Sequence, residues 1–322
     1  MKIERIVKKD LRKIRPLLSG NRFKPYYFLK QVPLGRLAAL LEWQLDKISS
    51  DRHSFILAAR DGRKYCGFIA LEKQGWDTSF FGFSCYSIRH FFAREGRGQE
   101  CAAKAFLLEQ ALKVCRAEGG RYLNAKVDSQ DMAGFSVLRA HGFQVNAAML
   151  QLVYRVARPG GRYRPLCKIR PYKKEDLAAL KLIARGSMSF DHFHADPYFP
   201  KGAADRLYET LVENCCSGAA ADEVFVAVRN GKPVGYVACK FRRDISRILK
   251  VRVGYIRHLA VSPAEGFGCG PGLQEAALEW SRGKVDIVES TTTVQNLPIL
   301  KISLKTGMGV VASDFRLARW FG

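Results

Sequence analysis

The sequence predicts a mixed α/β (α+β) fold built from two similar domains in tandem, each a mostly antiparallel sheet flanked by helices. Two observations predict it. The chain has 322 residues, of which 48% are hydrophobic, so it is long enough for two domains that each bury a core. Segments of its first half also return, in the same order, in its second half, and such self-similarity indicates a duplicated unit.

The repeat begins at the start of each half. Residues 2–11 align without a gap to residues 168–177. Each segment predicts a short strand that runs into a helix, with Asp10 or Asp176 as the capping residue. The two halves are therefore expected to start with the same pair of elements.

A pair of strands joined by a tight turn follows in each half. Residues 55–62 parallel residues 224–231, and the first segment ends in Asp-Gly and the second in Asn-Gly. These dipeptides favour the positive φ angles that a hairpin turn needs. The returning strands are expected at residues 67–70 and 235–238.

The end of the repeat and the boundary between the halves are also visible. Residues 140–143 correspond to residues 305–308, each at the end of a helix before the last strands. Residues 158–165 are rich in Gly, Pro and charge, which is typical of a linker. The predicted organisation is an N-terminal domain at 1–157, a linker at 158–166 and a C-terminal domain at 167–322.

Composition limits the classes of function. No apolar segment approaches the roughly 20 residues of a membrane span, and the charged N-terminus lacks the apolar core of a signal peptide. The nine cysteines show no metal-type spacing, which favours free thiols in a cytoplasmic protein and predicts no metal. The net charge of +23 is spread over both halves. A solvated surface or a phosphate-bearing small molecule explains it better than a membrane or nucleic acid.

The motif with the most chemical content lies in the second half. An apolar strand at residues 255–263 is followed by the glycine-rich segment 264–273 and then by a helix. This order resembles the strand, pyrophosphate loop and helix of the GNAT acyltransferases, with Glu265 at the first position of the loop pattern. Residues 292–296 and the later pair at 307–308 resemble the asparagine and closing segment of the same family.

The resemblance extends to dTDP-fucosamine (dTDP-4-amino-4,6-dideoxygalactose) acetyltransferase and its relatives. Residues 75–82, 193–197 and 311–317 carry it. It implies an N-acetyltransferase that moves an acetyl or other acyl group from acyl-CoA to a primary amine. It also implies a small-molecule amine acceptor, with a nucleotide-linked amino sugar as the specific candidate.

The glycine-rich segment suits a pyrophosphate on physical grounds as well. Glycines let the backbone approach an anion closely, and the following helix adds the positive end of its dipole. Pro271 is expected in the first turn of that helix. By resemblance, acyl-CoA binding falls on the strand, the loop and the strand-five asparagine: Leu259, Ala260, Val261, Gly266, Phe267, Gly268, Cys269, Gly270, Gly272 and Asn296.

Acyl transfer also needs an oxyanion donor, a base and an acid for the departing thiolate. The resemblance implies a backbone N–H between Leu259 and Val261 as the donor, and it gives Ser303 the position of the thiolate acid. Histidine has the pKa that a base needs near neutrality. His258 on the strand is the first candidate. His192 and His194 are alternatives, and His194 and Asp196 are expected to contact the acceptor.

The first half is expected to be a degenerate copy. Its loop at residues 94–100 carries acids, while Asp131 stands at the position of Asn296 and Leu138 at that of Ser303. Two other functions stay open on the sequence. One is a GNAT-fold protein that binds CoA or another anion without catalysis, and the other is a protein- or RNA-directed acyltransferase.

Overall fold

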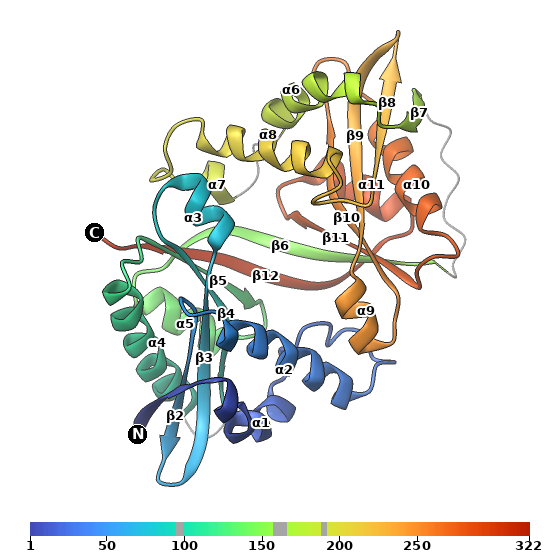
Figure 1. Ribbon diagram of the computed structural model, residues 1–322. Coiled ribbons are helices and arrows are strands. Elements are labelled where there is room, and N and C mark those ends of the chain that lie inside the picture. The colour runs from blue at the N-terminus through green and yellow to red at the C-terminus, as the bar shows by residue number, and fades with distance from the viewer. Residues whose placement is uncertain (95–98, 157–165, 188–191) are drawn as a thin grey trace. The chain divides into compact units, whose positions relative to one another are not determined.

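A computed structural model describes residues 1–94, 99–156, 166–187 and 192–322 (Figure 1). The predicted linker lies outside these residues except for Leu166, and residues 95–98 of the first loop also lie outside them. The described residues form two compact units, Met1–Ala148 with Asp314–Gly322 and Met149–Ser313. The domain limits placed at the linker stay a prediction.

The sheet of the first unit runs in the order β1, β2, β3, β4, β5, β12. Residues 2–155 begin with a strand and two helices, continue with two consecutive strands, and then alternate helices and strands. Their elements are β1 (Lys2–Ile6), η1 (Lys8–Asp10), α1 (Leu11–Gly20), α2 (Leu34–Ser50), β2 (Phe55–Asp61), β3 (Lys64–Lys73), α3 (Gly75–Phe81), β4 (Cys85–Ala93), α4 (Gln99–Ala117), β5 (Tyr122–Asp128), α5 (Met132–Ala140) and β6 (Gln144–Arg155).

The sheet of the second unit runs β7, β8, β9, β10, β11, β6. Residues 168–320 repeat the order of elements of residues 2–155, with the short helix α7 added. Their elements are β7 (Lys168–Pro171), η2 (Lys174–Asp176), α6 (Leu177–Ser187), α7 (His192–Ala195), α8 (Ala203–Cys216), β8 (Glu223–Arg229), β9 (Lys232–Phe241), α9 (Arg243–Leu249), β10 (Val253–Val261), α10 (Gly270–Ser281), β11 (Ile287–Thr293), α11 (Leu297–Lys305) and β12 (Gly309–Trp320).

Both sheets are mixed and mostly antiparallel, as predicted. In the first unit β4 runs parallel to β5, and in the second β10 runs parallel to β11. The other pairs recorded within each unit are antiparallel. The parallel pair is thus the same fourth and fifth strand of each copy.

The last strand of each sheet comes from a segment that follows the other unit in the sequence. Residues 149–155 of β6 pair with β11, whereas residues 314–320 of β12 pair with β5. The sequence repeat did not reveal this exchange, because the repeat conserves the order of elements and not their pairing. A cut at the linker would therefore remove a strand from each sheet.

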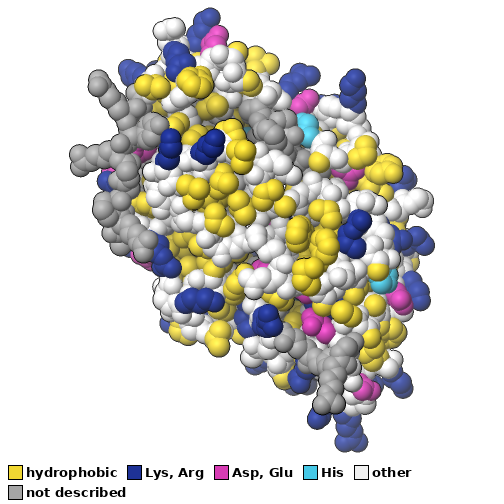
Figure 2. Space-filling view, turned by 180° about the vertical axis from the view of Figure 1, so that it is seen from behind, with side chains coloured by type: hydrophobic (Ala, Val, Ile, Leu, Met, Phe, Trp, Pro, Cys, Tyr) yellow, Lys and Arg dark blue, Asp and Glu magenta, His cyan; other side chains and the backbone are white. Residues whose placement is uncertain are grey.

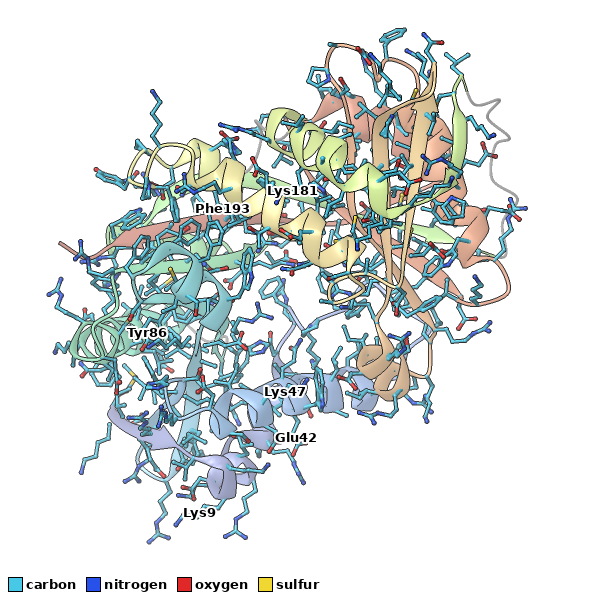
Figure 3. All side chains as sticks on the ribbon, turned by 45° about the horizontal axis from the view of Figure 1, so that its top comes forward. Lys9, Glu42, Lys47, Tyr86, Lys181 and Phe193 are labelled. Atoms are coloured by element: carbon cyan, nitrogen blue, oxygen red, sulfur yellow. The ribbon has the colours of Figure 1, made fainter. Side chains whose placement is uncertain are left out.

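Helices cover both faces of the sheet in the second unit. On one face, Leu273 of α10 packs in a buried cluster with Val237 of β9 and Ile256 of β10. Helices α6 and α8 contact the sheet too. Lys181 of α6, labelled in Figure 3, places its Nζ 3.2 Å from a carboxylate oxygen of Glu213 on α8. The sheet is thus buried between two helical layers, since side chains alternate between the faces of a strand.

Two local predictions need correction. The turn between β2 and β3 is centred on Gly62 and Arg63 and not on Asp-Gly, because Asp61 still pairs with Lys64. Asp10 makes no capping hydrogen bond to α1. It ends the short η1 turn with helical φ and ψ, and its carboxylate lies 3.0 Å from the Nζ of Lys13 instead.

Other local predictions hold. Asn230 and Gly231 have positive φ angles of 50° and 77° in the second hairpin. Asp176 accepts the backbone N–H of Lys173 at 2.8 Å and so stabilises the start of the following helix. Pro271 lies in the first turn of α10. These residues act through local geometry, which is why their sequence signals are reliable.

The surface agrees with a dispersed charge. On the face drawn in Figure 2, Lys and Arg side chains are scattered among hydrophobic and polar ones and do not form one continuous patch. Among the described helices, none combines the length and apolar character that crossing a bilayer requires.

Candidate active site

The central feature of the second unit is the separation of β10 from β11. The two strands pair only from Val253 with Ile287 to Tyr255 with Glu289. Beyond this point β10 continues along β9 and β11 continues along β6. Both strands lie wholly within the described residues, and Figure 1 shows them diverging. One edge of β10 is therefore left without a strand partner in this unit.

The register of β10 decides which backbone groups face that edge. His258 pairs with Ala238 and Ala260 with Tyr236. Ser262, two residues after Ala260, donates its N–H to the carbonyl of Val234 in β9 at 2.8 Å. Residues of an antiparallel strand direct their backbone groups alternately to either side. The N–H groups of Leu259 and Val261 therefore point toward the separated edge, whereas that of Ala260 points toward β9.

A bulge in β10 sets this register. The pairing with β9 shifts between Ile256 and His258, so Arg257 is the extra residue. A bulge adds one residue to a strand, so the residues after it direct their backbone groups to the opposite side from the one expected without it. The local twist of the strand also increases. The first unit has the same bulge at Arg89, between Ile88 and His90 of β4. The tripeptide Ile-Arg-His marks both bulges, a signal that the sequence carried and that sequence reasoning missed.

The loop after β10 places several unused N–H groups at the N-terminus of α10. The N–H of Gly266 donates to Ser262 and that of Cys269 donates to Gly266. No hydrogen bond to a described residue is recorded for four other N–H groups, and a ligand anion can use them. These belong to Phe267, Gly268, Gly270 and Gly272.

The glycines of this loop are required for different reasons. A Cβ at Gly266 would lie 2.7 Å from backbone atoms of Ser262 and Val234. Gly268 has a φ of 76°, and a Cβ there would lie 2.6 Å from the Leu166 side chain. At Gly270 a Cβ would meet Ile302 of α11 at 2.8 Å. The requirement at Gly268 thus comes from backbone conformation and from Leu166.

His258 belongs to a stack of rings on the face of the sheet opposite α10. Its ring lies parallel to that of Tyr208 on α8, with centroids 5.5 Å apart, and Tyr208 in turn stacks on His194 at 6.0 Å. The Nδ1 of His258 shares a 2.6 Å hydrogen bond with the hydroxyl of Tyr236. His258 is 8% exposed. Neither tyrosine was predicted, because each looks like an ordinary core residue in the sequence.

The other predicted acceptor residues lie near this stack. His194 on α7 places its Nε2 3.2 Å from Asp205. Phe193, labelled in Figure 3, anchors the same short helix by an edge-to-face contact with Phe199 at 5.2 Å. Asp196 is buried and accepts the backbone N–H of Tyr198 at 3.1 Å. Nothing is described of the side chain of His192.

Comparison with known proteins agrees with this geometry. Residues 189–303 match the family model described as the acetyltransferase (GNAT) family. This match lies within the second unit. The matched segment includes the diverging strands, the glycine-rich loop and the ring stack described above.

Solved structures of similar proteins extend the likeness in fold to the whole chain. The spore coat polysaccharide biosynthesis protein SpsD of Bacillus subtilis (strain 168) is 21% identical over 208 residues, which cover 63% of this chain and 69% of SpsD. A tandem GNAT protein from the clavulanic acid biosynthesis pathway superposes with a TM-score of 0.57 and 12% identity, over 100% of this chain and 98% of its own. A GCN5-related N-acetyltransferase from Sphaerobacter thermophilus gives a TM-score of 0.62 and 13% identity, over 99% and 95%.

Helix α11, which follows β11, carries Ser303 and is capped by Asn296. Asn296 caps α11, and its side chain accepts the N–H of Ile299 at 3.4 Å. Ser303 is 1% exposed, and its hydroxyl donates to the side-chain carbonyl of Gln274 on α10 at 3.3 Å. The Gln274 amide donates to Thr306 at 2.6 Å. Ser303 thus lies inside the contact between α10 and α11.

Metal chemistry finds no support among the described side chains. No group of three or more His, Cys, Asp or Glu residues is placed to hold an ion there. The cysteines described are free thiols.

Proposed function

We propose that this chain is an N-acyltransferase whose second unit binds acyl-CoA and transfers the acyl group to a primary amine. The separation of β10 from β11 carries the proposal. An extended ligand can lie along the free edge of β10 and hydrogen-bond to it as an added strand would. The glycine-rich loop continues from that edge and ends at a helix N-terminus that suits a pyrophosphate.

The backbone of β10 supplies the groups that the reaction requires. The amine attacks the thioester carbonyl, a C–N bond forms, and the C–S bond then breaks to release the thiolate. Negative charge develops on the carbonyl oxygen in between. The N–H of Leu259 is directed to the free edge and is the proposed donor to that oxygen, with Val261 available to the pantetheine arm.

His258 is the proposed base for the amine. A neutral imidazole accepts a proton on one nitrogen only when the other carries the hydrogen. To accept at Nε2, His258 must hold its hydrogen on Nδ1 and donate it to the Tyr236 oxygen. Burial raises the pKa of Tyr236 well above its ordinary value, so the phenol stays protonated and neutral beside the ring. Tyr236 thereby fixes the orientation of the imidazole.

A nucleotide-linked amino sugar is the proposed acceptor. The resemblance to dTDP-fucosamine acetyltransferase and the relation to SpsD, which is named for polysaccharide biosynthesis, support it. A net charge of +23 suits an anionic acceptor. His194 lies at the surface end of the ring stack and is the proposed contact to it. Asp196 is proposed to shape the same segment through its turn.

The placement of Ser303 favours a second candidate, a GNAT-fold protein that binds CoA without catalysis. A thiolate acid must reach the departing sulfur, and Ser303 is instead held by Gln274 between two helices. Under the enzymatic proposal, Ser303→Ala changes turnover less than about twofold, since the thiolate leaves without this residue. A fall of tenfold or more would restore the serine as a proton relay.

The full chain, mixed with acetyl-CoA and dTDP-4-amino-4,6-dideoxygalactose, tests the proposal by mass spectrometry of the sugar nucleotide. We expect a gain of one acetyl group. The corresponding 4-hydroxy sugar nucleotide is the control and should stay unmodified. Calorimetric binding of CoA without acetylation of any amine would favour the second candidate, and absence of CoA binding would overturn both.

A further inference from the structure

Arg229, at the end of β8, holds the glycine-rich loop from a different strand. Its guanidinium donates to the backbone carbonyl of Glu265 at 2.7 Å and to that of Phe267 at 2.7 Å. It also lies 3.4 Å from the sulfur of Cys269, the N-cap residue of α10. One side chain therefore contacts every second residue of the loop from Glu265 to Cys269.

These contacts fix the direction of the loop's N–H groups. A trans peptide is planar, so its C=O and the following N–H point in opposite directions. Because the Phe267 carbonyl points to Arg229, the N–H of Gly268 points away from it. The N–H of Gly268 is one of the groups without a described partner. By the same geometry the Glu265 carbonyl fixes the N–H of Gly266, which donates to Ser262 at 2.8 Å.

The charge of Arg229 matters at this place. The loop's own charged side chain is Glu265, a carboxylate that repels an incoming pyrophosphate and lies at the surface. Guanidinium is always protonated and offers several donors in a rigid plane. The Arg229 cation, beside the loop's carbonyl oxygens, offsets the negative charge of Glu265 and is attracted to the negative ends of the carbonyl dipoles.

We propose that Arg229 is a positioning residue that pre-forms the pyrophosphate loop, so that acyl-CoA meets oriented N–H groups without first ordering the loop. The inference rests on the proposed acyl-CoA site. It predicts an effect on CoA affinity and on loop order, with none on the acyl-transfer step itself, since Arg229 contacts backbone and not the reacting atoms.

The test compares Arg229→Met and Arg229→Lys with Arg60→Met in the full chain. Arg60 lies one residue before the end of β2, the strand of the first unit that corresponds to β8, and Asp61 takes the register position of Arg229. Three readouts are taken: amide hydrogen exchange of residues 262–273 without ligand, the Kd of CoA by calorimetry, and kcat at saturating acetyl-CoA. Exchange across β10 reports whether the variants remain folded.

For Arg229→Met we expect loop exchange about tenfold faster and a CoA Kd raised about 10- to 100-fold, the range of one to two charged hydrogen bonds. The value of kcat should stay within twofold. Arg229→Lys should fall between, and Arg60→Met should match the wild type.

Unchanged loop exchange in Arg229→Met would overturn the inference, and so would an unchanged CoA Kd in a wild type that binds CoA. If the wild type binds no CoA, the proposed function fails. The exchange data still decide the positioning role by themselves, with faster loop exchange supporting it.

Discussion

The two units differ most at the N-terminus of the helix that follows the fourth strand. In the second unit this helix starts with Gly270 and carries Gln274 one turn later. When Glu95-Gly96 is aligned with Glu265-Gly266, the matching residues of the first unit are Glu100 and Lys104. The Nζ of Lys104 lies 2.9 Å from Glu100 and 2.5 Å from Asp131, the equivalent of Asn296.

The charged groups of this cluster pair with one another. Lys104 is 1% exposed, and its Nζ lies 5.6 Å from the centroid of the Phe91 ring. Asp131 also accepts the N–H of Gly134 at 2.8 Å and so caps α5. The comparison teaches that the first unit holds an internal ion pair near this end of the helix, whereas the second unit has the uncharged residues Gly270, Gln274 and Asn296 at the same three positions.

The largest contrast is expected at the two equivalent histidines. His258→Ala should lower kcat by about 10²- to 10⁴-fold, the usual contribution of a proton-transfer group. The CoA Kd should stay within twofold. His90→Ala in the first unit should leave kcat unchanged. Steady-state kinetics of both variants decide the matter, and equal losses from the two would contradict the assignment of catalysis to the second unit.

The ion pair of the first unit offers the next largest effect. Lys104→Met should destabilise the protein by about 3–5 kcal/mol, because it leaves the buried carboxylate of Asp131 without a cation beside it. Lys113→Met, at an exposed position of the same helix, is the matched control and should change stability by less than about 0.5 kcal/mol. Urea denaturation followed by circular dichroism measures both.

A double variant sharpens this prediction. Lys104→Gln with Asp131→Asn places the residue types of Gln274 and Asn296 at these two positions and removes both charges. It should recover a large part of the stability lost in Lys104→Met. A double variant as unstable as Lys104→Met would show that the charges are not the reason for the loss.

Gly266→Val should weaken CoA binding by about 100-fold or more. The added Cβ would lie 2.7 Å from backbone atoms of Ser262 and Val234, so the loop has to move. Gly35→Ala is the control, because a Cβ there meets nothing within 4 Å. Calorimetry with CoA tests both variants, and tight binding by Gly266→Val would remove the loop from the proposed site.

A further prediction concerns the acid sensitivity of the first unit. Desolvation lowers the pKa of His90 to about 3, and the charge of Arg89 acts in the same direction. In the unfolded chain His90 therefore takes up a proton near pH 6.5, whereas in the folded chain it does so only near pH 3. Stability should fall as the pH drops through this window. His90→Gln should flatten that part of a stability profile, and an unchanged profile would contradict the low pKa.

The sequence predicted the elements because those depend on local signals. The repeat, the Asn-Gly turn and the glycine-rich segment each carry their own geometry. The exchange of β6 and β12 was not predictable, because strand pairing depends on contacts far apart in the chain. The Lys104–Asp131 pair was missed for the same reason.

Side-chain roles were harder to predict than positions. Ser303 was assigned from its spacing after Asn296, and spacing does not report what a side chain packs against. Gln274, its partner, lies on another helix. Tyr208 and Tyr236 gain meaning only once α8 and β9 bring them to His258. Arg229 acts on a loop 36 residues away in the sequence.

One measurement tests the central claim most directly: hydrogen exchange of the full chain with and without CoA, with the stoichiometry taken from calorimetry. The account predicts one CoA per chain and slower exchange in residues 259–273, with no change in residues 88–105. Protection of residues 88–105 while residues 259–273 stay unchanged would contradict it, as would two bound CoA molecules per chain.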